Sequence, residues 1–316
     1  MAALPMGLAT PALAQAPWPS KPVTLLVPFP PAGASDITAR AINTRLAEKH
    51  GVSVVVENRP GANGQLASRM LARAAPDGYT LMVGAIGAFA LNAVLYRNPG
   101  YDPVADFAPI TLAVTTPNVL VINPSVVPLR DLPGLLAWMR ERPSQVFHAT
   151  SGIGSSPHLT MELFTQMTGT QATHVPARGA AAATMDLIAG HIPISFQGLG
   201  TVIAPLREGR LRAILVTDAQ RSPLIPDVLT AAEAGLPDFE ITSWQAVMGP
   251  VGLAPALVDR ISTEVRSVLR EPSNITTLAE GGYTVVADAP AEYRAFQIAE
   301  IERWRRVARR ANIVLD

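Results

Sequence analysis

The chain has 316 residues, of which 48% are hydrophobic and 16% charged, so it can bury one large or two medium cores and is not a disordered chain. Lys and Arg total 25, as do Asp and Glu, and this balance provides no basic surface for nucleic acid. Cysteine is absent, which excludes disulfides, thiol nucleophiles and cysteine-ligated metal centres.

The N-terminal residues differ from the rest of the chain in composition. Residues 1–16 are small, apolar and uncharged and end in Ala14-Gln15-Ala16, which is similar to the apolar region and cleavage site of a secretory signal peptide. The basic segment that normally precedes such a region is missing. We therefore expect residues 1–17 to be a signal-peptide remnant or a disordered tail. A cleaved signal peptide would place the mature protein in the periplasm.

Short β-branched runs and helical patterns alternate along the chain. Strands are predicted at residues 23–27, 52–56, 79–83, 119–122, 146–150, 173–175, 192–196 and 211–216. Helices are predicted after the first, second, fourth, fifth and sixth of these strands and at the C-terminus, with Ser35 and Asp131 as N-caps of two of them. This alternation indicates an α/β fold with a largely parallel sheet. The uncharged stretch 78–96 reads as a strand, a glycine turn and a helix start, so no transmembrane segment is expected.

Three of the predicted strand-to-helix turns are short and contain glycine, at residues 28–36, 151–156 and 176–179. An open α/β sheet binds ligands beyond the carboxyl ends of its strands, and a helix N-terminus there can hold an anion without Lys or Arg. In the first turn Gly33 lets a ligand approach the backbone and Ser35 adds a hydroxyl, whereas Asp36 is expected to bond neighbouring N–H groups. The alternative is an ordinary capped turn with no ligand.

The second turn combines two glycines and a helix start with three hydroxyls, those of Ser151, Ser155 and Ser156. This combination predicts an oxyanion cradle. It is not a nucleotide-binding P-loop, because Pro157 follows and no Lys-Ser or Lys-Thr ends it. In the third turn Arg178 could clamp a carboxylate with two parallel hydrogen bonds. The alternative for Arg178 is a solvated side chain at the rim.

The residues leave one alternative from enzyme chemistry. Ser156 and His158, with Asp186 as the orienting group, could form a serine hydrolase triad, but the sequence has no G-x-S-x-G elbow. No two histidines stand four residues apart with a carboxylate between them, so no zinc site is predicted. We expect neither an enzyme nor a bound metal or cofactor. Phe89 is a candidate pocket wall, with a core position as the alternative.

A set of motifs occurs in order along nearly the whole chain after residue 17, at residues 18–23, 27–40, 56–62, 75–81, 101–103, 106–110, 118–124, 154–159, 221–223, 232–237 and 242–244. In these motifs the chain resembles the Bug or TctC-like proteins, the periplasmic substrate-binding components of tripartite tricarboxylate transporters. The resemblance implies an α/β, two-lobed periplasmic-binding-protein (Venus flytrap) fold, each lobe a mostly parallel sheet flanked by helices. Lobe I would comprise residues 18–121 and 244–316, and lobe II residues 122–243.

The resemblance also implies a small carboxylate-bearing ligand, held between the lobes and delivered to membrane transporter subunits. The alternative is a receptor that reports ligand binding to a two-component sensor. Neither nucleic acid nor membrane insertion is expected, and a monomer is the simplest state. The expected ligand-binding residues are Phe29, Ala32, Gly33, Ser35, Asp36, Phe89, Ser151, Gly154, Ser155, Ser156, His158, Ala177, Arg178, Gly179 and Gln197.

Four positions depart from the family pattern. Ala32 replaces a glycine in the first turn, and its Cβ is expected to narrow that corner of the site. Ala177 and Arg178 replace a Tyr-Lys pair, which opens space. Gln197 replaces an aspartate and removes a negative charge, so we predict a di-, tri- or aromatic carboxylate without an amine.

Overall fold

The structure, a computed structural model, describes residues 18–311, so the predicted signal-peptide segment lies outside the described residues. Its ten-stranded sheet has the order β2-β1-β3-β9-β4-β7-β5-β6, and β8 and β10 both pair with β4. The strands are β1 (Val23–Val27), β2 (Val54–Asn58), β3 (Thr80–Ala85), β4 (Phe107–Ile122), β5 (Phe147–Thr150), β6 (Thr173–Pro176), β7 (Ile194–Gly198), β8 (Arg212–Val216), β9 (Thr242–Pro250) and β10 (Thr284–Val285).

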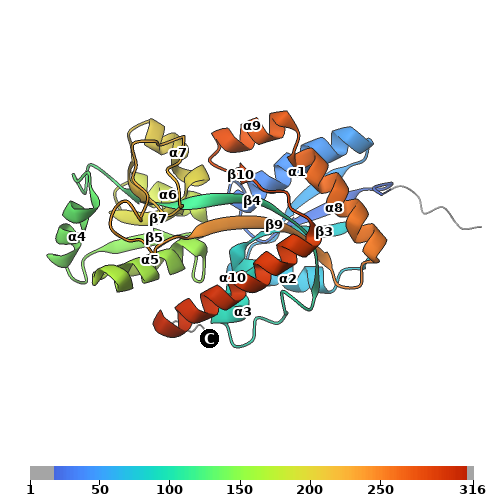
Figure 1. Ribbon diagram of the computed structural model, residues 1–316, viewed down its shortest axis with the longest axis horizontal. Helices are drawn as coiled ribbons and strands as arrows, with labels where there is room; N and C mark the ends of the chain where they lie inside the picture. Colours follow the sequence, from blue (N-terminus) through green and yellow to red (C-terminus); the bar gives the residue numbers. More distant parts are fainter. Residues whose placement is uncertain (1–17, 312–316) are drawn as a thin grey trace, which may run out of the picture.

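Helices gather around the two ends of this sheet, with α4 to α7 at one end of the molecule and α1, α2 and α8 at the other (Figure 1). The helical segments are α1 (Ala34–His50), η1 (Ala62–Gly64), α2 (Gln65–Ala72), η2 (Gly87–Leu91), α3 (Asn92–Leu95), α4 (Leu132–Arg140), α5 (Ser156–Thr168), α6 (Ala180–Ile188), α7 (Leu199–Arg207), α8 (Pro255–Leu269), α9 (Pro272–Glu280) and α10 (Pro290–Ala311).

Two parallel groups of strands form two lobes, joined by the longest strands. In lobe I, β1 pairs in parallel with β2 and β3, and in lobe II, β5 pairs in parallel with β6 and β7. Strand β4 pairs antiparallel with β9 along 107–117 and with β7 along 118–122. The strands β4 and β9 therefore run along the long axis of the molecule from one lobe to the other (Figure 1). The lobe boundaries at 121/122 and 243/244 stay predictions.

The sequence patterns did not indicate most of β4 or any of β9. Pro109 and Pro117 lie inside β4, and proline argues against a central strand because it has no N–H for the ladder. In the structure the register of β4 against β9 shifts between Pro109 and Thr111. That irregularity lets this long strand accommodate Pro109, which cannot donate a backbone hydrogen bond.

The starts of two helices test the predicted N-caps. The N-cap of α1 is Gly33, no side chain caps this helix, and Ser35 lies inside its first turn, so the prediction of Ser35 as a cap is wrong. The Ser35 hydroxyl instead donates to Oε1 of Gln245 at 2.6 Å. Asp131 caps α4 as predicted, because its Oδ1 accepts from the N–H of Gly134 at 2.8 Å.

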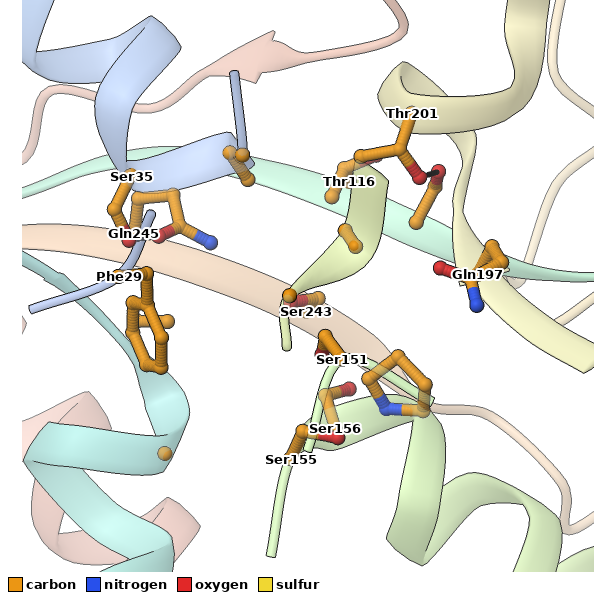
Figure 2. Close-up of a pocket in the computed structure, with 18 of the residues that line it drawn as sticks. Phe29, Ser35, Thr116, Ser151, Ser155, Ser156, Gln197, Thr201, Ser243 and Gln245 are labelled. Atoms are coloured by element: carbon orange, nitrogen blue, oxygen red, sulfur yellow. Dashed lines mark hydrogen bonds between the residues drawn. The ribbon is translucent and has the colours of Figure 1, made fainter. Parts of the chain in front are cut away.

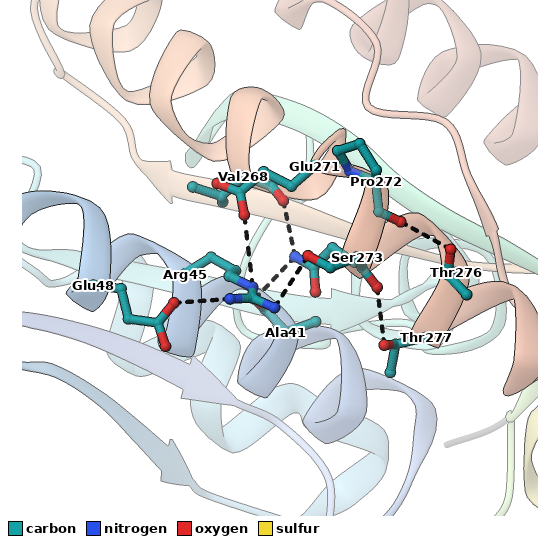
Figure 3. A network of polar contacts seen from close by, with 10 residues as sticks. Ala41, Arg45, Glu48, Val268, Glu271, Pro272, Ser273, Thr276 and Thr277 are labelled. Carbon is teal, nitrogen blue, oxygen red and sulfur yellow. Dashed lines mark hydrogen bonds and ion pairs between the residues drawn. The ribbon is translucent and has the colours of Figure 1, made fainter.

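Polar contacts attach α1 to the junction of α8 and α9 (Figure 3). The Arg45 guanidinium donates to Oγ of Ser273 at 3.1 Å and pairs with Glu271 at 3.6 Å. Nδ2 of Asn274 donates to the carbonyl of Ala41 at 3.2 Å. These contacts help to fix the position of α1, whose first turn borders the cavity described below.

The C-terminal helix α10 crosses the molecule diagonally and packs on β4, α3 and α5, so it touches both lobes (Figure 1). Glu300 on this helix accepts from the indole N–H groups of Trp244 at 3.1 Å and Trp304 at 3.2 Å. Both indole rings are almost fully buried. The helix therefore supports the crossing strand β9 from outside the cavity.

Candidate ligand-binding site

A cavity of about 100 Å³ lies between the two lobes, lined by the turns after β1, β3, β5, β6 and β7 and by residues of β4 and β9 (Figure 2). The turns at the carboxyl ends of the parallel strands come together here, as expected for an α/β sheet.

Four helices, α1, α5, α6 and α7, begin at the cavity wall. None of the four has a side-chain hydrogen bond that caps its first turn. The first backbone N–H groups of each helix have no hydrogen-bond partner within the helix, and they lie at the positive end of the helix dipole. They therefore favour an anion. Among the described residues of the lining, only Arg178 is charged. The cavity is therefore built for negative charge.

Asp36 stands in the first turn of α1 but does not line the cavity. Its carboxylate accepts from the N–H of Ala32 at 3.0 Å, from Nδ2 of Asn58 at 3.0 Å and from Arg40 at 2.9 Å. Burial opposes ionisation, but these bonds outweigh it and hold the pKa of Asp36 below its usual value. Arg40 thus neutralises its negative charge locally. The bond from the N–H of Ala32 agrees with the predicted local role of Asp36, and the carboxylate shapes the turn.

Ser156 and Gln245 each offer a hydrogen-bond donor to the cavity. Oγ of Ser156 accepts from Nδ2 of Asn118 at 2.9 Å, and this leaves the hydroxyl hydrogen of Ser156 available to a ligand. Oε1 of Gln245 is occupied by Ser35, and the amide nitrogen of Gln245 points away from Ser35 into the cavity (Figure 2). Both donors suit a carboxylate oxygen.

The hydroxyls of Ser155 and Thr201 in the lining are committed to protein carbonyls. Ser155 donates to the carbonyl of Gly152 at 2.7 Å, and Thr201 donates to the carbonyl of Gly198 at 2.8 Å. A hydroxyl has a single hydrogen, so these groups can only accept from a ligand. Of the three hydroxyls expected in the second turn, that of Ser155 holds the turn together.

The two lobes touch beside the cavity. Nδ2 of Asn63 in lobe I donates to the carbonyl of Gly154 in lobe II at 2.9 Å. A Cβ on Gly179 would lie 3.2 Å from Cγ of Pro30, and Gly179 has a φ of 112°, which side chains rarely adopt. Glycine is therefore required where the third turn meets the first. Contacts of this kind between lobes define a closed arrangement.

Three histidines stack behind the second turn. The ring centroids of His158 and His174 are 4.0 Å apart, and those of His148 and His174 are 5.0 Å apart. Burial lowers the pKa of His148 to about 3 and the pKa values of His158 and His174 to about 4. Nδ1 of His158 accepts from the N–H of Gly154 at 3.1 Å. These neutral rings support the cradle from behind.

The hydrogen-bond partners contradict the hydrolase alternative. His158 accepts from a backbone N–H of the turn, and Ser156 is paired with Asn118. Asp186 lies near His191, with 3.6 Å between Oδ1 and Nδ1. The three residues therefore do not form the hydrogen-bonded chain that a serine nucleophile needs.

The structure brings most of the expected ligand-binding residues to this one cavity: Phe29, Gly33, Ser35, Ser151, Ser155, Ser156, Arg178, Gly179 and Gln197. The remaining ones lie outside its lining: Ala32, Asp36, Phe89, Gly154, His158 and Ala177. Phe89 is fully buried and packs edge-on against Phe107 at 6.0 Å, so it is a core residue and its prediction as a pocket wall is wrong. Ala32 is exposed, and its Cβ does not narrow the cavity. Ligand contact by the lining residues stays a prediction.

Sequence reasoning missed several polar lining residues: Asn63, Thr116, Asn118, Ser243, Gln245 and Tyr283. Ser243 and Gln245 stand on either side of Trp244 in β9. Alternate positions of a strand share a face, so this spacing could have indicated a polar surface. No local sequence pattern marks Asn118 or Tyr283 as a lining residue.

Among residues 18–311, no group of three or more His, Cys, Asp or Glu side chains is placed to hold a metal ion. Within the same part of the chain, no helix combines the length and the apolar character needed to span a membrane.

The fold and the anion-favouring cavity between its lobes define a two-lobed solute-binding protein. The family profile described as "Tripartite tricarboxylate transporter family receptor" matches residues 38–313. The chain therefore belongs to the tripartite tricarboxylate transporter receptor family. The resemblance inferred from the motifs, and with it the prediction of a solute-binding receptor, is confirmed.

Relatives and solved structures agree with this assignment. Protein BugT of Bordetella pertussis is 34% identical over 304 residues, which cover 96% of this chain and 93% of BugT. A structure of an R. palustris protein with adipate is 37% identical, has a TM-score of 0.91, and covers 94% of this chain and 99% of that chain. MatC from Rhodopseudomonas palustris with bound malate is 31% identical, with a TM-score of 0.86 and coverage of 92% and 99%. The predicted two-lobed α/β fold class is confirmed.

Proposed function

We propose that this protein is a periplasmic receptor that captures a small dicarboxylate between its lobes and delivers it to a tripartite tricarboxylate-type membrane transporter, without catalysing a reaction. The convergence of four uncapped helix N-termini and Arg178, with no acidic residue among the described lining residues, carries this proposal. An anion is the ligand that these groups stabilise best.

The ligands of two solved relatives support a small dicarboxylate, since these are adipate and malate, acids of six and four carbons. The absence of an acidic side chain from the described lining disfavours amino acids, because a negative partner is what best stabilises an ammonium group.

The protein is first unfolded and refolded to remove any ligand that it carries. Calorimetric titration with malate, succinate, adipate and aspartate then tests the proposal. Dicarboxylates should bind more tightly than aspartate. A ligand at 100 times its dissociation constant should also stabilise the fold by about 2.7 kcal/mol. If none of the dicarboxylates binds, the proposal is wrong.

A matched pair of variants tests the role of Arg178. Arg178→Gln should weaken dicarboxylate binding at least fivefold, because it removes the one charged group of the described lining. Arg130→Gln makes the same change on an exposed arginine of lobe II that does not line the cavity, and it should leave the affinity unchanged. Equal effects of the two substitutions would count against a direct contact.

A further inference from the structure

The amide of Gln197, at the end of β7, has a fixed orientation. Its Nε2 donates to Oγ of Ser195 at 2.8 Å. The single hydroxyl hydrogen of Ser195 points to backbone carbonyls, that of Ala149 among them, so Ser195 can only accept from Gln197. The amide oxygen of Gln197 must therefore lie on the opposite side, and it faces the cavity (Figure 2).

This amide oxygen is an acceptor without a donor. The side chain of Gln197 is fully buried, and no group among the described residues donates to its Oε1. A buried carbonyl that stays unpaired costs free energy comparable to a lost hydrogen bond. Because Gln197 lines the cavity, a hydrogen-bond donor on a bound ligand can supply the missing hydrogen.

The surroundings of Gln197 select a neutral donor. Arg178 and the first turns of α6 and α7 border the same cavity and disfavour a positive ammonium group. The same positive surroundings lower the pKa of a ligand carboxyl, so a carboxyl there stays ionised and has no hydrogen to donate. A hydroxyl is uncharged and meets both conditions. It can also accept from a first-turn N–H group of α7.

We infer that Gln197 is a specificity-determining residue, which accepts a hydrogen bond from a hydroxyl on the bound acid, so that the preferred ligands are hydroxy-substituted dicarboxylates. This inference rests on the proposed function. Ser156, Gln245 and the helix N-termini hold the carboxylates, and Gln197 distinguishes the hydroxy acid from its unsubstituted counterpart. An unsubstituted acid leaves the amide oxygen unpaired, which weakens its binding.

Matched pairs of acids that differ by one hydroxyl test the inference: malate with succinate, and 2-hydroxyglutarate with glutarate. Calorimetric titration should show that the wild-type protein binds the better-bound enantiomer of each hydroxy acid at least tenfold more tightly than the unsubstituted acid. Gln197→Met removes the acceptor at nearly constant size, and it should reduce the preference to less than threefold by weakening the binding of the hydroxy acid. Gln220→Met makes the same change on an exposed glutamine of lobe II that does not line the cavity, and it should keep the preference.

A second variant keeps the test decisive if Gln197→Met does not fold. Gln197→Glu has the same shape but adds a negative charge, so it should weaken malate binding and raise the affinity for aspartate relative to malate at least tenfold. Equal affinities of the wild-type protein for malate and succinate, or an unchanged preference in a folded Gln197→Met variant, would overturn the inference and leave the proposed function intact. Absence of binding by any of these acids would overturn both.

Discussion

Removal of the Asn63 side chain should loosen the closed state. Its Nδ2 donates to Gly154 of the other lobe at 2.9 Å and to Oδ1 of Asn92 in its own lobe at 2.9 Å. Asn63 has a φ of 50°, a left-handed conformation that glycine adopts without strain. Asn63→Gly therefore removes both side-chain contacts and keeps the backbone of the turn.

The expected effect on affinity follows from the contact between the lobes. A neutral hydrogen bond contributes about 0.5–1.5 kcal/mol net, and this one exists only when the lobes are closed. Its loss lowers the population of the binding-competent state, which raises the apparent Kd by about 2- to 13-fold. The contact with Asn92 lies within lobe I, so its loss lowers the stability of the free and bound protein alike and leaves Kd unchanged.

Calorimetric titration with the tightest-binding acid measures this change, and small-angle scattering with and without ligand reports the closure. Asn98→Gly is the matched control, because Asn98 is an exposed asparagine of lobe I whose side chain bonds the nearby N–H of Gly100. The control should bind as the wild-type protein does. A folded Asn63→Gly variant with unchanged Kd and unchanged closure would refute the reasoning.

Three further predictions concern other parts of the molecule. Ala32 has a φ of 62°, so Ala32→Gly should raise the free energy of unfolding by up to about 1 kcal/mol in urea titrations, and a loss of stability would contradict this account. Ser156→Ala removes a donor to a charged ligand, worth about 1.5–3 kcal/mol, and should raise the calorimetric Kd by roughly 13- to 160-fold; a change below threefold would argue against the contact. The lowered pKa values of His148, His158 and His174 mean that the unfolded chain binds more protons between about pH 6.5 and 4, so the free energy of unfolding should fall as the pH is lowered through that range. His148→Leu should show a smaller fall in urea titrations at pH 7 and pH 5, and an equal fall would exclude His148 as a source.

Local patterns in the sequence were sufficient for the elements and turns whose causes are local. The β-branched run of β1, the cap Asp131 and the glycine-containing turns after β1, β5 and β6 were all identified. Each of these depends on propensity, capping or backbone freedom within a few residues. The prediction of an anion site followed from the same turns, because a helix N-terminus has its positive end whatever the rest of the fold does.

Only the tertiary structure decided which side chains complete the cavity and what their atoms are free to do. Ser35 meets Gln245 across 210 positions of sequence, and Asn63 meets Gly154 across 91. The hydrogen of Ser156 is free, and that of Ser155 is not, because of partners that no local pattern specifies. By itself the sequence determined the family, the parallel strands and the charge of ligand that the turns favour. The packing of the lobes through β4 and β9 decided the rest, since hydrogen bonds between distant segments depend on how those segments are brought together.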